Sequence, residues 1–427
     1  MGRIFEDENN LEDINITEQD VVDQIKLLDS SKAYGPDLVP PKILKEGGEI
    51  IVKHLTKLFK LTVRKMTIPK LWKQANVIPI YKKDKRTIVN NYRPISLLSV
   101  VSKVMERVIF KYVYNHLHDN FILSTYQSGF LPGRSTVTQL IEVYHSFCKS
   151  IDRNKEVRVI FLDISKAFDR VWHKGLLHKL QKCGITGNIL GWFSNYLSNR
   201  QQRVVIEGQF SEFIDINAGV PQGSVLGPLL FLLYINDITH AISNCQIRLF
   251  ADDTCLFIEV DNREETALLL NHDLESLHKW SVEWLVDFSE TKTKSMIISN
   301  KKDKDKNPPV FLNGKEIENV RSFSYLGLEL TNNMRWNKHI DKISNKAKKR
   351  LSAMIPLKLK LSRKAEIMYQ AFVRPIIDYC SVIWGGSYDS EITKLEKNQV
   401  DALSLITGAK AKSNIEKLNK ECPIMQV

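Results

Sequence analysis

The sequence predicts an α/β fold, and three observations support that prediction. Residues 157–164 (Val-Arg-Val-Ile-Phe-Leu-Asp-Ile) form a β-rich apolar run, which is typical of a buried strand. Residues 247–259 form two short apolar runs around 251–254 (Ala-Asp-Asp-Thr), the pattern of a β-hairpin. Residues 264–284 instead carry leucines at helical spacing. The 427 residues suffice for one large multi-lobed unit or two to three ordinary domains.

The remaining elements follow from local signals. Thr17 to Asp20 form a capping box that opens an amphipathic helix, and residues 35–37 (Gly-Pro-Asp) end that helix in a turn. A helix is expected from about Lys166, and short strands at 203–206 and 213–217. Ser224 is expected to cap an apolar helix that runs to about Ile235. Residues 313–314 (Asn-Gly) predict a hairpin, after the charged loop 299–309. From Trp336 the chain turns helical, with one apolar stripe: Ile340, Ile343, Ala347, Leu351 and Met354.

The chain is basic, with a formal net charge of +12 and a pI of about 9.2. Such a charge favours a polyanionic partner, either nucleic acid or an acidic membrane surface. The excess is concentrated in residues 42–111, with 17 Lys and Arg against 4 acids, and in 335–364, with 11 against one. Trp72, Tyr81 and Tyr92 lie within the first segment, where they either stack on single-stranded bases or belong to the core beneath a solvated face.

The six cysteines lack a C-x-x-C pair, which argues against a zinc knuckle and a disulfide framework. A reducing compartment fits best, so we expect an intracellular protein, cytoplasmic or nuclear. The N-terminus is acidic and lacks an apolar signal segment. The longest apolar stretch, Val225 to Ile235, is far shorter than the ~20 residues that cross a bilayer, so no membrane association is expected.

Three aspartates carry the chemistry that the sequence suggests. Asp163 ends an apolar strand, and Asp252 and Asp253 stand together at a hairpin tip. Adjacent carboxylates in apolar surroundings repel one another, and a divalent cation relieves that repulsion. Mg²⁺ accepts one or two carboxylates together with water and substrate phosphate oxygens. The alternative for the Asp-Asp pair alone is an ordinary turn, since Asp favours turns.

Five ordered motifs resemble those of reverse transcriptases from non-LTR (LINE-type) retrotransposons, closest to the jockey-like group. The resemblance covers about residues 17–417. The motifs are 91–98 (Asn-Tyr-Arg-Pro-Ile-Ser-Leu-Leu), 127–130 (Gln-Ser-Gly-Phe), 161–169 (Phe-Leu-Asp-Ile-Ser-Lys-Ala-Phe-Asp), 218–228 (Ala-Gly-Val-Pro-Gln-Gly-Ser-Val-Leu-Gly-Pro) and 250–253 (Phe-Ala-Asp-Asp). Departures from the group, Tyr34 for Pro and Ser289-Glu290 for Asn-Pro, put only local geometry in doubt.

The resemblance implies roles for particular residues. Asp163, Asp252 and Asp253 match the metal-binding carboxylates, with the Ile164 carbonyl as a further ligand. Phe168 matches the steric gate that excludes a 2′-hydroxyl, whereas outside this motif it would be taken as a core aromatic. Asp169 is expected to be a helix or loop acid. The residues expected around the incoming nucleotide are Phe168, Gln222, Gly223, Arg93, Lys103 and Lys292. Tyr325, Leu326 and Gly327 match the hairpin that grips the primer end, where Tyr325 alone would read as core.

The resemblance also implies a right-hand polymerase fold of fingers, palm and thumb, with an antiparallel palm sheet in which 157–164 and 247–259 are adjacent. The expected division is a lead-in and helix at 1–31, fingers at 32–156, palm at 157–300, a charged loop and primer-grip hairpin at 301–334, and a helical basic thumb with a truncated C-terminal segment at 335–427. The reverse transcriptase domain itself is expected at about 62–330.

The implied activity is RNA-directed DNA synthesis with two Mg²⁺ ions, or Mn²⁺ in their place. The implied partners are an RNA template, a DNA primer or target DNA, and deoxynucleoside triphosphates. An RNA-primed replicase or bacterial intron-type enzyme is disfavoured by the jockey-like thumb. The rival from another class is a decayed element fragment that only binds nucleic acid. Against it stand all three aspartates, Phe168 and Gln222 in an uninterrupted frame. About 30 residues precede the fingers and the chain ends at Val427, so neither an endonuclease nor a ribonuclease H region is expected.

Overall fold

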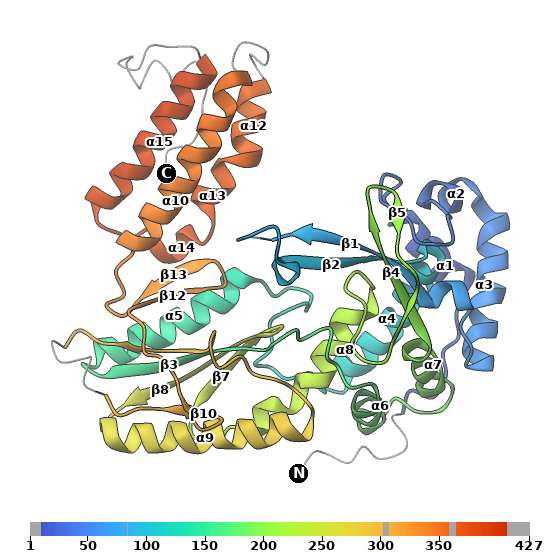
Figure 1. The fold of residues 1–427 in the computed structure, drawn as a ribbon, viewed down its shortest axis with the longest axis horizontal. Coiled ribbons are helices and arrows are strands. Elements are labelled where there is room, and N and C mark those ends of the chain that lie inside the picture. Colours follow the sequence, from blue (N-terminus) through green and yellow to red (C-terminus); the bar gives the residue numbers. More distant parts are fainter. Residues whose placement is uncertain (1–9, 83, 302–306, 358–363, 408–427) are drawn as a thin grey trace.

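The computed structural model describes residues 10–82, 84–301, 307–357 and 364–407. Parts of the acidic lead-in, of the charged loop 299–309, of the basic segment 335–364 and of the C-terminal stretch therefore lie outside the described residues. The described chain forms a mixed α/β structure with two larger sheets and a C-terminal group of helices (Figure 1). No helix in this part of the chain is both long and apolar enough to cross a membrane.

The central sheet has four antiparallel strands in the order β7-β8-β3-β9. Its strands are β3 (Glu156–Asp163), β7 (Gln246–Phe250), β8 (Asp253–Val260) and β9 (Lys294–Ile298). Helix α9 (Arg263–Glu283) covers one face, and helix α5 (Thr136–Asp152) covers the other (Figure 1). Because both faces are covered, alternate residues of β3 enter different cores, which explains its continuous apolar run. The predicted strand, the hairpin and their adjacency are confirmed.

A second sheet runs in the order β2-β1-β4-β5, with β6 also paired to β4. Its strands are β1 (Gln74–Tyr81), β2 (Tyr92–Leu97), β4 (Arg200–Ile206), β5 (Gln209–Phe210) and β6 (Ile214–Ile216). The strands predicted at 203–206 and 213–217 are thus present. The helices of this part are α1 (Glu18–Lys26), α2 (Pro41–Glu46), α3 (Gly48–Lys65), α4 (Val100–Asp119), α6 (His173–Lys182), α7 (Gly187–Leu197) and α8 (Leu226–Ile235).

Two small hairpins follow the central sheet. The predicted Asn313-Gly314 turn joins β10 (Phe311–Leu312) to β11 (Lys315–Glu316). The second hairpin pairs β12 (Ser322–Tyr325) with β13 (Leu328–Thr331). Its two-residue loop, Leu326-Gly327, has positive φ at both positions, as a tight hairpin turn requires.

The C-terminal helices stand over one end of the central sheet (Figure 1). They are α10 (Asn337–Met354), α12 (Lys364–Phe372), α13 (Arg374–Asp378), α14 (Ser381–Trp384) and α15 (Asp389–Thr407). The predicted apolar stripe of α10 is buried, and it packs in one core with residues of α13 and α15. The basic side chains of α10 lie outside that stripe, so the helix keeps a charged face.

Three local predictions need correction. Residues 165–170 form turns and α6 begins only at His173, so the helix expected from Lys166 is wrong there. The reason is tertiary: Phe168 and Val171 accept backbone hydrogen bonds from Val220 and Gly219, which hold the chain in turns. Helix α1 has the predicted Thr17 capping box but ends at Lys26, well before Gly35. Helix α8 begins at Leu226 with Val225 as the capping residue, while the Ser224 hydroxyl accepts a bond from the Gly227 amide.

We expect Ile160→Ala to lower the free energy of unfolding by about 2–5 kcal/mol, because the truncation leaves a cavity in a packed core. Ile160 is fully buried in the middle of β3. Thermal or urea denaturation measures the change. Ile80→Ala is the matched control, since the Ile80 side chain is 50% exposed and its loss should cost under about 0.5 kcal/mol. Equal effects of the two variants would contradict this account of the core.

Candidate active site

The strand register brings two of the three aspartates face to face. Asp163 is the last residue of β3 and pairs directly with Asp253, the first residue of β8. Both side chains lie on the same face of the sheet. Asp163 follows Phe161 by two residues and Asp253 precedes Cys255 by two, and Phe161 and Cys255 both belong to the core on that face. Asp252, the residue before Asp253, lies in the two-residue loop that joins β7 to β8. The structure therefore gathers Asp163, Asp252 and Asp253, as the sequence predicted.

The electrostatics of these carboxylates are unfavourable in the metal-free protein. Burial and the charges of Asp252 and Asp163 raise the pKa of Asp253 to about 6, although part of its side chain remains open to solvent. Burial, followed by the charge of Asp163, also raises the pKa of Asp252. The cations Lys82 and Arg93 act in the opposite direction on Asp252. The charges at the β1–β2 hairpin of the second sheet therefore act on Asp252.

Carboxylate oxygens are ligands that a hard divalent cation prefers. Mg²⁺ needs only one or two protein carboxylates, the rest of its shell being water and phosphate. Among the described residues, no group of three or more His, Cys, Asp or Glu side chains is arranged so that it could hold a metal ion. The Ile164 carbonyl is left free by the neighbouring bridge, whose two bonds join Ser165 to Asp287 and Ser289 to Asp163.

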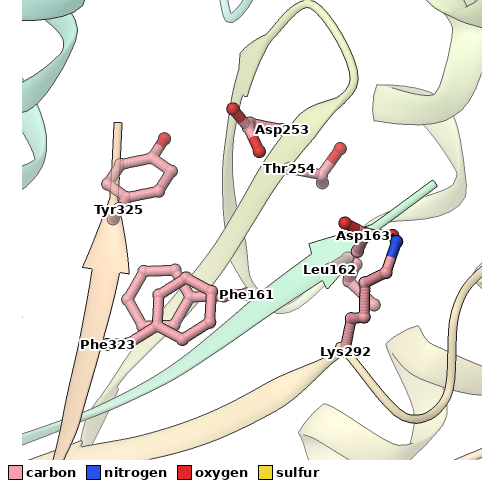
Figure 2. Close-up of a pocket in the computed structure, with 8 residues that line it drawn as sticks. All are labelled: Phe161, Leu162, Asp163, Asp253, Thr254, Lys292, Phe323 and Tyr325. Carbon is pink, nitrogen blue, oxygen red and sulfur yellow. The ribbon is translucent and has the colours of Figure 1, made fainter. Parts of the chain in front are cut away.

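A pocket of about 200 Å³ opens beside Asp163 and Asp253 (Figure 2). Its remaining walls are Phe161, Leu162, Thr254, Lys292, Phe323 and Tyr325. The Lys292 ammonium lies 3.0 Å from the Asp163 carboxylate, so the predicted lysine does reach the site. The rings of Phe161 and Phe323 stack with centroids 4.3 Å apart, and this places the β12–β13 hairpin against the central sheet.

The expected primer-grip residues lie at that hairpin. Tyr325 is only 2% exposed, with its ring 5.3 Å from that of Phe161 and its hydroxyl bonded to Gln139. The Leu326 carbonyl accepts a hydrogen bond from the Tyr379 hydroxyl, and Gly327 lies against the same ring. Tyr325 thus belongs to the core and also lines the pocket, while half-buried Leu326 and exposed Gly327 form the turn.

Phe168, Gln222 and Gly223 belong to two segments that backbone hydrogen bonds hold together, from Gly219 to Val171 and from Val220 to Phe168. Phe168 stacks on Phe231 of α8 with ring centroids 4.6 Å apart. The Gln222 amide donates a 2.8 Å hydrogen bond to Asp169, an interaction that the sequence did not suggest. Gly223 has a φ of 120°, and a Cβ there would lie 2.6 Å from the Ser96 carbonyl, so only glycine fits. This loop therefore touches both the turn after β3 and strand β2.

The two remaining cations differ in position. Arg93 is exposed on β2 and close enough to the aspartates to lower the pKa of Asp252. Lys103 lies on α4, where burial lowers its pKa and the charges that act on it are those of Glu106 and Arg107. Arg93 therefore contributes to the electrostatic surroundings of Asp252, whereas the charges that act on Lys103 are not those of the aspartates.

Glu106 is a site-supporting residue that the sequence reading missed. It is 1% exposed, and its carboxylate accepts hydrogen bonds from the amides of Val225 and Leu226 at 2.8 and 3.3 Å. A carboxylate at a helix N-terminus satisfies otherwise unpaired donors and opposes the helix dipole. Glu106 therefore fixes α8 directly after the Gln222-Gly223 loop. The only feature of the sequence that could have indicated this role is that Glu106 is an acid within the otherwise basic and apolar segment 100–111.

Comparison with known proteins agrees with this site. The family model of reverse transcriptase (RNA-dependent DNA polymerase) matches residues 80–330, which is more than half of the chain and includes the three aspartates. The chain belongs to the reverse transcriptase family.

The relatives point to one branch of that family. The chain is 30% identical over 399 residues to the probable RNA-directed DNA polymerase from transposon X-element of Drosophila melanogaster. The matched region covers 91% of this chain and 44% of that relative. The chain is 30% identical over 408 residues to the RNA-directed DNA polymerase from mobile element jockey of the same species, covering 92% and 44%. A type-1 retrotransposable element R1 polyprotein of Bradysia coprophila is 26% identical over 374 residues, covering 86% and 37%. The predicted kinship with jockey-like non-LTR elements is confirmed, and the chain spans less than half the length of these relatives.

The raised pKa of Asp253 predicts how stability depends on pH without divalent cations. Its folded-state pKa of about 6 exceeds the usual value near 4, so the folded state binds the proton more tightly. Stability should therefore fall as the pH rises from about 4 to about 6, and Asp253→Asn should remove part of that fall. Denaturation at several pH values in a chelating buffer, then with added Mg²⁺, measures the effect. Mg²⁺ should restore stability to the wild type more than to the variant.

Asp20→Asn is the control of opposite sign. Although burial works against it, hydrogen bonds from Lys111 and from Thr17 and Tyr112 lower the pKa of Asp20 to about 2. Ionised Asp20 thus stabilises the folded state above its unfolded pKa near 4, and the variant should lose stability there. A wild-type profile that Asp253→Asn leaves unchanged would contradict the cluster described here.

Proposed function

We propose that this chain is an RNA-directed DNA polymerase, which adds deoxynucleotides to the 3′-hydroxyl of a primer along an RNA template. The observation that carries the proposal is the register pair Asp163–Asp253, with Asp252 beside it, in a chain of the reverse transcriptase family. Two metal ions bound there would activate the 3′-hydroxyl and stabilise the leaving pyrophosphate, with Mg²⁺ as the expected ion and Mn²⁺ as its substitute. Asp163, Asp252 and Asp253 would hold them, with the Ile164 carbonyl as a further ligand.

The division into fingers, palm and thumb is part of the proposal. The central sheet with α9 would be the palm, the β1–β2 hairpin with its surrounding helices the fingers, and the helices from α10 onward the thumb. Strands β4 to β6 share a sheet with β1 and β2, so we assign them to the fingers although they lie within the 157–300 sequence range. Helix α5 packs on the central sheet and supports the palm from within the 32–156 range.

The nucleotide and primer would occupy opposite sides of the aspartates. Phe168, Gln222, Gly223 and Arg93 would surround the nucleotide on one side, where the flat ring of Phe168 would meet a 2′-hydroxyl. Lys292 is placed to donate a proton or a charge-assisted hydrogen bond to phosphate, and it is exposed enough to move. The pocket beside Tyr325 would receive the primer end, and the basic face of α10 would follow the duplex backbone. A polymerase with these substrates would work in the cytoplasm or nucleus.

Primer extension tests the activity. With an RNA template, an annealed DNA primer, deoxynucleotides and Mg²⁺, the wild type should extend the primer and Asp252→Asn should lose extension by at least about 10²-fold, since each metal ligand contributes several kcal/mol. Asp215→Asn, an exposed aspartate of β6, is the matched control and should extend normally. If wild type and Asp252→Asn both bind template while neither extends, the alternative of a binding-only relic holds.

Phe168→Ala tests the sugar gate. Removing the ring should leave deoxynucleotide addition measurable and should raise ribonucleotide addition by on the order of 10-fold or more, because a steric clash with the 2′-hydroxyl is lost. The ratio of kcat/KM for ribo- and deoxynucleotides measures the change. Phe130→Ala serves as control, since that ring makes an edge contact with Phe168 and is 53% exposed. Unchanged sugar selectivity in Phe168→Ala would show that the ring is only packing.

A further inference from the structure

The loop that presents Asp252 has a backbone conformation that its own sequence does not favour. Ala251 has a φ of 53°, in the left-handed region that residues with a Cβ seldom enter. Such a residue costs on the order of 1–3 kcal/mol and persists only when its surroundings hold it. Ala251 is 5% exposed, so the holding groups must come from the protein itself.

The side chain of Gln127 supplies the hold. Its amide oxygen accepts hydrogen bonds from the Ala251 amide at 2.9 Å and from the Gly129 amide at 2.7 Å. Gln127 is 4% exposed, and its amide nitrogen is buried and has no hydrogen-bond partner among the residues that the structure describes. Burying an unsatisfied donor is costly, so the two hydrogen bonds that the amide oxygen accepts must offset that cost.

The backbone around Gln127 is fitted to the same loop. Ser128 donates to the Leu249 carbonyl and Leu249 donates to the Tyr126 carbonyl, both at 2.9 Å, so the segment runs alongside β7. A Cβ on Gly129 would lie 2.2 Å from the Ala251 nitrogen, so only glycine permits this approach. The segment 126–129 and the aspartate loop are therefore in direct backbone contact.

A second arm leads from the same segment to the other hairpin of the site. The Ser128 hydroxyl donates to Gln139 at 2.9 Å, and the Gln139 amide bonds the Tyr325 hydroxyl at 3.3 Å. Gln139 is fully buried on α5. Through Gln139, these hydrogen bonds connect Ser128 to Tyr325, which lines the pocket beside Asp253.

We propose that Gln127 is a positioning residue that holds the Ala251-Asp252 loop in its left-handed conformation and so sets the placement of the metal-binding carboxylates. The proposal rests on the polymerase function proposed above for the meaning of that placement. The contact itself does not depend on that function. Gln127 touches neither substrate nor metal in this account and acts through the backbone of Ala251.

Amide hydrogen exchange tests the contact without any activity. Gln127→Met keeps the length of the side chain and removes the acceptor, so exchange at Ala251 should rise by at least about 10-fold. Gln127→Glu keeps an acceptor for both amides and should restore protection. Gln139→Met is the matched control: the same substitution at a buried glutamine one link away should leave Ala251 protected. Unchanged exchange in Gln127→Met, or an equal rise in Gln139→Met, would overturn the proposal.

Metal binding and primer extension test the consequence. Titration of the full-length Gln127→Met variant with Mn²⁺ should give weaker binding than the wild type. Its kcat should fall by on the order of 10²-fold, because a misplacement of about 1 Å can cause such a loss. Its KM for deoxynucleotide should change little. A rise in KM with unchanged kcat and Mn²⁺ affinity would overturn the positioning role. If the wild type binds Mn²⁺ but does not extend primers, the polymerase function fails while the exchange and Mn²⁺ results still decide the role of Gln127.

Discussion

Eight consecutive residue pairs join β3 to β8, and the geometry of the site depends on that ladder. Side chains alternate between the faces of a strand, so a slip of one residue would place Thr254 opposite Asp163 and turn Asp253 to the other face. The register is set by burial on both sides of the sheet, since α5 and α9 accept different residues of β3. The apolar core thereby fixes the positions of carboxylates that lie at its edge.

The same burial makes the carboxylates costly. Desolvation is the largest cause of the raised pKa of both Asp252 and Asp253, and the mutual repulsion of the aspartates adds to it. Folding therefore holds together groups that would separate in water, by means of strand pairing and the bonds to the Ala251 loop. A rigid arrangement of this kind favours a ligand that removes the repulsion between the carboxylates. Such rigidity is a requirement for a preorganised cation site.

The parts of the fold that local sequence determines were predictable. The capping box of α1, the Asn313-Gly314 turn and the apolar stripe of α10 each depend on residues a few positions apart. The motif residues predicted the gathering of Asp163, Asp252 and Asp253, and the structure agrees. Partners far along the chain could not be predicted. Gln127 bonds a residue 124 positions away and Glu106 one 119 positions away, and no local pattern specifies either. The helix expected from Lys166 was wrong for the same reason, because Val220 and Gly219 hold that segment in turns.

The ion pair between Lys292 and Asp163 connects the resting site to its proposed use. Both side chains are substantially exposed, 67% and 38%, and an exposed pair contributes only about 0–1 kcal/mol. A divalent cation bound as proposed would displace the ammonium from Asp163 at little cost, and it would add to the positive charge that Lys82 already supplies to Asp252 and Asp253. Lys292 would then be released at the pocket edge, where a phosphate group would be the next anion within reach. Under the proposed function, Lys292 would balance the charge of Asp163 until that carboxylate binds a cation, and Lys292 would then be available to the substrate.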